Sequence, residues 1–100
     1  MTFGPLVDTA WLHEHLEDED VRVIDFRWYL KDRRGRDEYD RGHIPGAVFV
    51  DLDSVTGEGA GRHPLPTAAQ FEREMEIAGV SSDSRVVVYD DVGGSLAARL

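Results

Sequence analysis

Three short apolar runs divide this sequence, and polar or amphipathic segments separate them. The runs cover residues 21–26, 47–50 and 85–89, and their β-branched residues predict three strands. The second run is apolar at every position, which is typical of a strand buried on both faces of a parallel sheet. The pattern therefore predicts three strands.

Helix signals lie between these runs. Asp8 is a suitable N-cap for a helix over residues 8–16. A second helix is predicted to begin at Thr67, which forms a T-x-x-Q capping box with Gln70. Its apolar stripe has helical spacing and consists of Phe71, Met75 and Ala78. Gly79 stands where a helix-ending glycine is expected.

The remaining segments predict loops. Residues 27–39 are polar and suit a surface loop with one short helical turn. Gly42, Pro45 and Gly46 give residues 42–47 the composition of a turn, because proline fixes its own φ and glycine accepts unusual backbone angles. Residues 56–66 are rich in glycine and proline and predict an exposed loop.

Strands that alternate with helices predict an α/β fold, with a mainly parallel sheet flanked by helices. We expect one domain over residues 1–100. A last helix is predicted to open at Ser95, and it has only six residues before the sequence ends, against a typical length of about 11. We therefore expect a domain that is truncated at its C-terminal end. Strand order is not predicted.

Composition narrows the possible functions. The chain has no cysteine, which excludes a disulfide scaffold, a CxxC zinc site and a thiolate nucleophile within it. The net charge of −9 repels phosphate backbones and anionic lipid, so neither nucleic acid nor a membrane surface is an expected partner. His13 and His15 do not share a helix face, and no metal site or cofactor is predicted.

The hydropathy of the chain gives no sign of a membrane protein. No apolar run approaches the roughly 20 residues that a membrane span needs. The first residues lack the basic start and apolar stretch of a signal peptide. We therefore expect a cytoplasmic protein.

Three segments, VRVIDFR, YDRGHIPGAVFVDLD and VVVYDD, resemble the rhodanese-like sulfurtransferase family. The resemblance covers residues 6–100 and is closest to the first domain of tandem thiosulfate and 3-mercaptopyruvate sulfurtransferases. It implies a rhodanese-like fold and a non-catalytic role. In such a protein a second domain of the same polypeptide bears a cysteine, which moves sulfane sulfur from thiosulfate or 3-mercaptopyruvate to cyanide or a thiol through a persulfide. Small sulfur donors would bind in the cleft between the domains, and no cofactor is needed.

The resemblance places Asp90 where a catalytic rhodanese has its cysteine. The loop that follows, which we expect to be a pseudo-active-site loop, consists of Asp90, Asp91, Val92, Gly93, Gly94 and Ser95. A carboxylate can accept the backbone N–H groups that would otherwise stabilise a persulfide, but it accepts sulfur poorly. We therefore expect Asp90 to cap its own loop, and this chain alone to have no sulfurtransferase activity.

Other polar residues admit two interpretations each. Asp53 and His63 flank the glycine-rich loop, either as ordinary surface residues or, as the resemblance implies, as contributors to proton transfer in an inter-domain cleft. Asp25 and Arg27 are expected to form a structural ion pair. His43 is expected to stabilise the turn by hydrogen bonding. Arg33, Arg34 and Arg36 predict a solvated loop rather than an anion site.

Two other functions remain open at this stage. Asp51 and Asp53 match the DxDx[TV] motif of haloacid-dehalogenase-like phosphatases, with Asp51 as the nucleophile, Asp53 as the acid or base and Mg²⁺ between carboxylate and phosphate. That chemistry needs a downstream lysine, and the only lysine, Lys31, lies upstream. The second alternative is a stand-alone, inactive rhodanese-like module that binds or regulates a partner.

Overall fold

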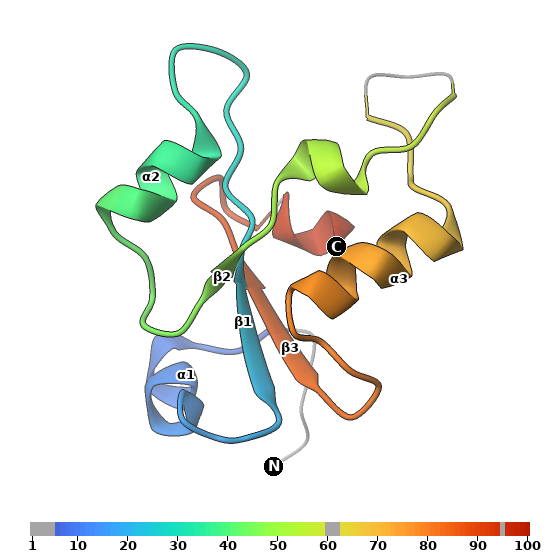
Figure 1. Ribbon diagram of the computed structural model, residues 1–100. Coiled ribbons are helices and arrows are strands. Elements are labelled where there is room, and N and C mark those ends of the chain that lie inside the picture. Colours follow the sequence, from blue (N-terminus) through green and yellow to red (C-terminus); the bar gives the residue numbers. More distant parts are fainter. Residues whose placement is uncertain (1–5, 60–62, 95) are drawn as a thin grey trace.

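The computed structural model describes residues 6–59, 63–94 and 96–100, and it contains a three-stranded parallel sheet (Figure 1). The strands are β1 (Val21–Asp25), β2 (Val48–Phe49) and β3 (Arg85–Tyr89), in the order β2-β1-β3. Ile24 in β1 pairs with Val48 on one side and with Val88 on the other. The predicted mainly parallel α/β architecture is confirmed.

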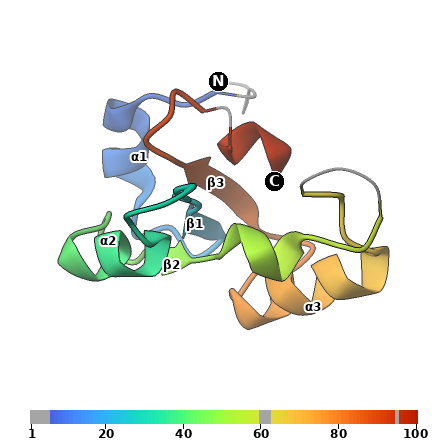
Figure 2. The ribbon, with the colours of Figure 1, turned by 90° about the horizontal axis from the view of Figure 1, so that it is seen from above.

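Helices cover both faces of this sheet (Figure 2). On one face α1 (Thr9–His15) packs through Leu12 against Val21, Val23 and Val87. On the other face α3 (Ala68–Ile77) and the 3₁₀ helix η1 (Leu52–Val55) pack through Met75 and Leu52 against Ile24 and Phe26. The alternation of buried residues along β1 supplies both cores, as expected for a strand whose successive side chains point to opposite faces.

The caps of the two predicted helices form largely as expected. The Asp8 carboxylate accepts a hydrogen bond from the backbone of Trp11 at 2.8 Å. The Thr67 hydroxyl accepts one from the backbone of Gln70 at 3.1 Å. The other half of the predicted capping box is wrong, because the Gln70 side chain instead donates to the carbonyls of Ser54 and Thr56. Gln70 therefore joins α3 to η1.

The polar segment after β1 is more helical than predicted. Instead of one short turn within residues 27–39, α2 spans Gly35–Arg41. Gly35 allows α2 to approach the end of β1 closely, since a Cβ there would lie 2.1 Å from the carbonyl oxygen of Arg27. The structure therefore requires glycine at the start of this helix.

Two further expectations are wrong. β2 contains two residues rather than four and lies at an edge of the sheet, where Val48 remains 37% exposed, so it is not buried on both faces. Near the C-terminus the chain forms a 3₁₀ helix, η2 (Ala97–Arg99), rather than an α-helix. The predicted start at Ser95 lies outside the described residues.

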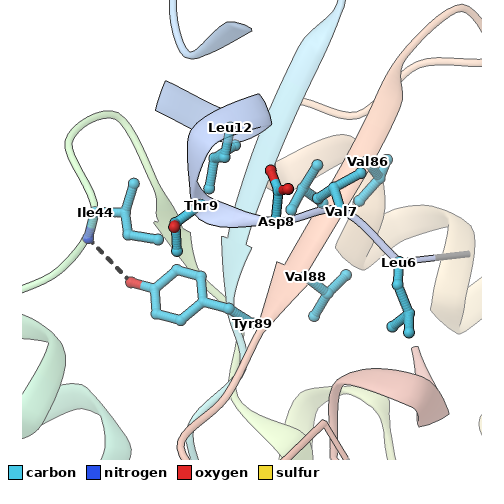
Figure 3. A pocket seen from close by; sticks show the side chains of 10 residues that line it. Leu6, Val7, Asp8, Thr9, Leu12, Ile44, Val86, Val88 and Tyr89 are labelled. Atoms are coloured by element: carbon cyan, nitrogen blue, oxygen red, sulfur yellow. Dashed lines mark hydrogen bonds between the residues drawn. The ribbon is translucent and has the colours of Figure 1, made fainter. Parts of the chain in front are cut away.

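β3 forms the opposite edge of the sheet. The N–H of Arg85 donates to the carbonyl of Asp20, and the carbonyl of Tyr89 accepts from the N–H of Phe26, so both ends of β3 bond to the residues that flank β1. Alternation along the strand then directs the backbone groups of Val86 and Val88 away from β1. A hollow of about 410 Å³ runs along this edge and is lined by residues of α1, β3 and the segment before α1, together with Ile44 (Figure 3). No helix in the described part of the chain is both long enough and apolar enough to cross a bilayer.

Candidate functional site

The carboxyl ends of the parallel strands gather the acidic residues that the sequence singled out. β1 ends at Asp25, β3 ends one residue before Asp90, and Asp51 follows β2 by two residues. The loops that follow β1 and β3 lie at the same end of the sheet (Figure 1). Ligands of open α/β sheets bind beside the carboxyl ends of the strands, so we describe the loops at these strand ends in turn.

The Asp90 carboxylate lies inside its own loop. Backbone N–H groups donate to both of its oxygens over 2.8–3.0 Å; the donors are Val92, Gly94, Leu96 and Ala97. Gly93 and Gly94 have φ values of 73° and 91°, which residues with a side chain rarely adopt, so they let the loop turn around the carboxylate. Ser95 lies outside the described residues.

This arrangement determines the charge state of Asp90. Partial burial raises the pKa of the carboxyl, but the backbone hydrogen bonds from Ala97, Gly94, Val92 and Leu96 outweigh that effect and lower the pKa below 3.8. The loop therefore holds Asp90 as an ionised carboxylate. The expected self-capping of Asp90 is present in the structure.

The end of β1 is held by a buried ion pair. Asp25 is fully buried, and Oδ2 of its carboxylate lies 2.8 Å from Nη2 of Arg27. The same Nη2 donates to the carbonyl of Gly42 at 2.7 Å. The Tyr89 hydroxyl donates to Asp25 at 2.8 Å and accepts from the backbone of Ile44 at 3.1 Å. Asp25 and Arg27 thus form the expected pair and connect β1 to the turn at residues 42–47.

That turn has the geometry its composition predicts. Pro45 and Gly46 occupy its two central positions, Gly46 has φ +81°, and the N–H of Ala47 donates to the carbonyl of Ile44 at 2.9 Å, as in a type II turn. Nδ1 of His43 lies 2.7 Å from the carbonyl of Tyr39, and the two rings stack 3.7 Å apart. His43 therefore stabilises the end of α2 and the start of the turn.

Asp53 and His63 do not form a pair. Asp53 is exposed in η1, and its backbone N–H donates to the Asp51 carboxylate at 2.9 Å. The His63 ring lies edge-to-face against Trp28, with centroids 4.9 Å apart. Among the described residues, no hydrogen bond or ion pair joins Asp53 to His63, so within this chain the structure does not pair these two candidate residues.

One contact at the carboxyl ends of the strands was not predicted from the sequence. The Tyr29 hydroxyl donates to the Asp91 carboxylate at 2.5 Å and joins the loop after β1 to the loop after β3. Burial and this hydrogen bond raise the pKa of Tyr29. Arg33 lies 4.1 Å from the Tyr29 ring centroid and also pairs with Glu38.

The other arginines and the DxD motif give little support to an anion or metal site. Arg36 pairs with Asp40 at 3.3 Å, and Arg34 is exposed. The Asp51 side chain caps η1. Within residues 6–59, 63–94 and 96–100, no three acidic or histidine side chains are grouped so that they could hold a metal ion. The phosphatase interpretation gains no support from this geometry.

Comparison with known proteins identifies relatives of the whole chain. The model of the rhodanese-like domain family matches residues 8–100. Thiosulfate/3-mercaptopyruvate sulfurtransferase 2 of Arabidopsis thaliana is 38% identical over 102 residues, which are 99% of this chain and 30% of that protein. The probable 3-mercaptopyruvate sulfurtransferase of Pseudomonas aeruginosa is 38% identical over 105 residues, 99% of this chain and 37% of that protein.

Two solved structures of sulfurtransferases superpose on this chain. The crystal structure of SseA from Escherichia coli, described as a 3-mercaptopyruvate sulfotransferase, superposes with a TM-score of 0.75 at 37% identity and covers 82% of this chain and 33% of that one. The 3-mercaptopyruvate sulfurtransferase from Leishmania major gives a TM-score of 0.78 at 28% identity, covering 90% and 26%. The chain spans about a third of the length of the relatives it matches.

Proposed function

The chain belongs to the rhodanese-like domain family, and we propose that it is the N-terminal, non-catalytic domain of a tandem sulfurtransferase. Its parent would move sulfane sulfur from thiosulfate or 3-mercaptopyruvate to cyanide or a thiol. The occupied loop around Asp90 is the observation that carries the proposal, because a carboxylate stands where the family resemblance expects the cysteine. The names of the relatives and the third of their length that this chain covers also support it.

The chemistry needs a thiolate that this chain does not contain. In the first half-reaction a cysteine thiolate of the second domain attacks the donor sulfur and releases sulfite or pyruvate, leaving a persulfide. In the second half-reaction the acceptor takes the outer sulfur and restores the thiolate. The Asp90 carboxylate cannot replace the thiolate, because its oxygens are poor nucleophiles toward sulfur and are hydrogen-bonded.

The domain would then act on the second domain's active site from the opposite side of a shared cleft. We propose that the loops at the carboxyl ends of its strands cover the cleft and exclude water, with Asp53 and His63 available for proton transfer. The second domain of the same polypeptide is the proposed partner, and the sulfur donor is the proposed ligand of the cleft.

The experiment that tests this proposal is the intact mass of the natural gene product. This chain is 11.2 kDa, whereas a two-domain rhodanese should be about 30 kDa from typical domain sizes. A mass near 30 kDa, with a cysteine that forms a persulfide in thiosulfate or 3-mercaptopyruvate, supports the proposal. A mass near 11 kDa contradicts it and favours a cysteine-free binding module.

The chain itself provides a second test. Incubated with thiosulfate and cyanide, or with 3-mercaptopyruvate and cyanide, it should form no thiocyanate above the uncatalysed rate. Thiocyanate formation by this cysteine-free chain would contradict the proposed division of labour between the two domains.

A further inference from the structure

We infer that residues 31–36, which we call the basic loop, attract the anionic sulfur donor to the carboxyl ends of the strands. Lys31 and Arg34 supply the part of this attraction that no acidic partner neutralises, and they favour the donor with the greater negative charge. The identity of the anion rests on the proposed function. The charge distribution that attracts an anion to this place rests on the chain alone.

The basic loop is the strongest concentration of positive charge in an acidic chain. Its sequence, KDRRGR, contains four basic residues and one acidic residue, a net charge of +3. Because the whole chain carries −9, its other residues carry −12. A protein with this charge repels small anions over most of its surface. An anion that approaches the domain therefore finds its most favourable potential near the basic loop.

The basic loop lies at the same end of the sheet as the Asp90 loop (Figure 1). It follows β1 and ends in the first turn of α2. Two residues before it, the Tyr29 hydroxyl donates to the Asp91 carboxylate of the loop after β3 at 2.5 Å. Within it, the Arg33 guanidinium lies 4.1 Å from the centroid of the Tyr29 ring. These contacts connect the basic loop to the Asp90 loop, on the side of the domain where the proposed function places the donor.

Acidic residues of α2 neutralise only half of the four cations. Two arginines are paired with carboxylates at 3.0 and 3.3 Å; the pairs are Arg33–Glu38 and Arg36–Asp40. Lys31 and Arg34 are exposed, and among the described residues neither has a hydrogen-bond or ion-pair partner. Exposed cations act on a dissolved anion through a field that is screened by salt, so no fixed contact with the donor is required.

The charges of the two proposed donors make this attraction measurable. Thiosulfate is a dianion, whereas 3-mercaptopyruvate has a single carboxylate. The energy of an ion in a given potential is proportional to its charge. Removing one cation should therefore reduce the local concentration of thiosulfate by the square of the factor for 3-mercaptopyruvate. The effect should fall on kcat/KM, because kcat is measured when the site is already filled.

The field is tested on the chain itself with two nitroxide probes of similar size and opposite charge, which relax nearby amide protons. The anionic probe should relax protons of residues 31–36 more strongly than the cationic probe does, and over most of the remaining surface the order should reverse. Lys31→Gln and Arg34→Gln should each reduce the excess. Arg73→Gln is the matched control, because Arg73 is an exposed cation of α3 without a described partner, so it should leave the excess unchanged. A parent chain without an excess for the anionic probe near the basic loop overturns the inference.

The consequence for the donor is tested on the full-length sulfurtransferase. Lys31→Gln and Arg34→Gln should each lower kcat/KM for thiosulfate roughly two- to threefold at low ionic strength and leave kcat unchanged. The loss for 3-mercaptopyruvate should be the square root of that factor, and about 1 M salt, where the Debye length is about 3 Å, should abolish both losses. Arg73→Gln should change neither value.

Equal losses for the two donors, or losses that persist in high salt, overturn attraction by a field. A full-length protein that is inactive with both donors overturns the proposed function, and the choice of anion with it. The relaxation measurement is independent of activity, so it shows separately whether the field itself is present.

Discussion

The hydroxyl of Tyr89 donates a hydrogen bond to the carboxylate of Asp25 at 2.8 Å, so the last residue of β3 is bonded to the last residue of β1. Asp25 is fully buried and ionically paired with Arg27, which extends the same network to the carbonyl of Gly42. One carboxylate therefore joins two strand ends and a turn. The Asp90 loop begins at the residue after Tyr89, so this network also fixes where that loop starts.

Removing the Asp25 carboxylate should destabilise the fold strongly. Asp25→Ala leaves the half-buried Arg27 and the Tyr89 hydroxyl without their acceptor, and breaking a buried pair in this way costs about 3–5 kcal/mol. Urea denaturation measures the loss. Asp40→Ala removes the exposed partner of Arg36 and should change the free energy of unfolding far less. Equal losses in the two variants would show that the Asp25 network contributes nothing beyond a surface ion pair.

Alkaline pH should weaken the same network. Burial, the first cause, together with the hydrogen bond to Asp25, raises the pKa of Tyr89 from 10.0 to about 12. A group whose folded pKa is raised stabilises the fold fully below its unfolded pKa, so this contribution should be lost as pH rises from 10 to about 12. Ultraviolet difference titration should show one tyrosine that ionises near pH 12, and Tyr89→Phe should remove that step. A variant that keeps the step assigns it to another tyrosine.

The parts of the fold that the sequence predicted correctly have local signals. β1 and β3 each contain three β-branched residues, and α1 and α3 begin at side chains that cap their own backbone. α2 was underpredicted because it buries no side chain and has no side-chain cap, so no apolar stripe identified it. The burial of β2 was overpredicted because an apolar run shows only that a strand can be buried, whereas its neighbours decide whether it is.

In the candidate site, too, the contacts between residues close in sequence were predictable and those between distant residues were not. The capping of Asp90 was predictable, since the acceptor and the glycines that wrap around it are adjacent in sequence. Tyr29 and Asp91 are 62 residues apart, and neither has a local pattern that identifies the other. Trp28 and His63, whose rings are in contact, are likewise far apart in sequence, and neither has a local pattern that identifies the other.

Gly35 should tolerate no side chain. A Cβ at this position would lie 2.1 Å from the carbonyl oxygen of Arg27 and 3.1 Å from the Phe49 ring, and backbone atoms cannot yield as a flexible side chain can. Overpacking of this kind costs about 1–3 kcal/mol, so Gly35→Ala should lower the midpoint of thermal unfolding. Gly42 is the matched control, because a Cβ there would meet nothing within 4 Å and its φ of 175° is extended backbone. Similar midpoints for the two variants would contradict the close approach of α2 to the end of β1.

Acid should reveal the contribution of the Asp90 charge. Asp90→Asn keeps one acceptor oxygen but turns an amide donor toward N–H groups of the loop, and we expect a loss of about 1–2 kcal/mol at neutral pH, since the carboxylate is only partly shielded from water. The folded pKa of Asp90 is lowered, so the stabilisation by its charge is fully present above the unfolded value of 3.8 and is lost as pH falls through the folded pKa. The difference in the free energy of unfolding between the parent chain and Asp90→Asn, measured by urea denaturation, should therefore be constant above about pH 5 and shrink at more acidic pH.

Asp83→Asn serves as the control, because Asp83 is exposed and has no side-chain partner among the described residues, so its effect should be small throughout. A difference for Asp90→Asn that grows as the pH falls would mean that the loop stabilises the protonated carboxyl, and it would contradict the self-capped loop from which the proposed function was argued.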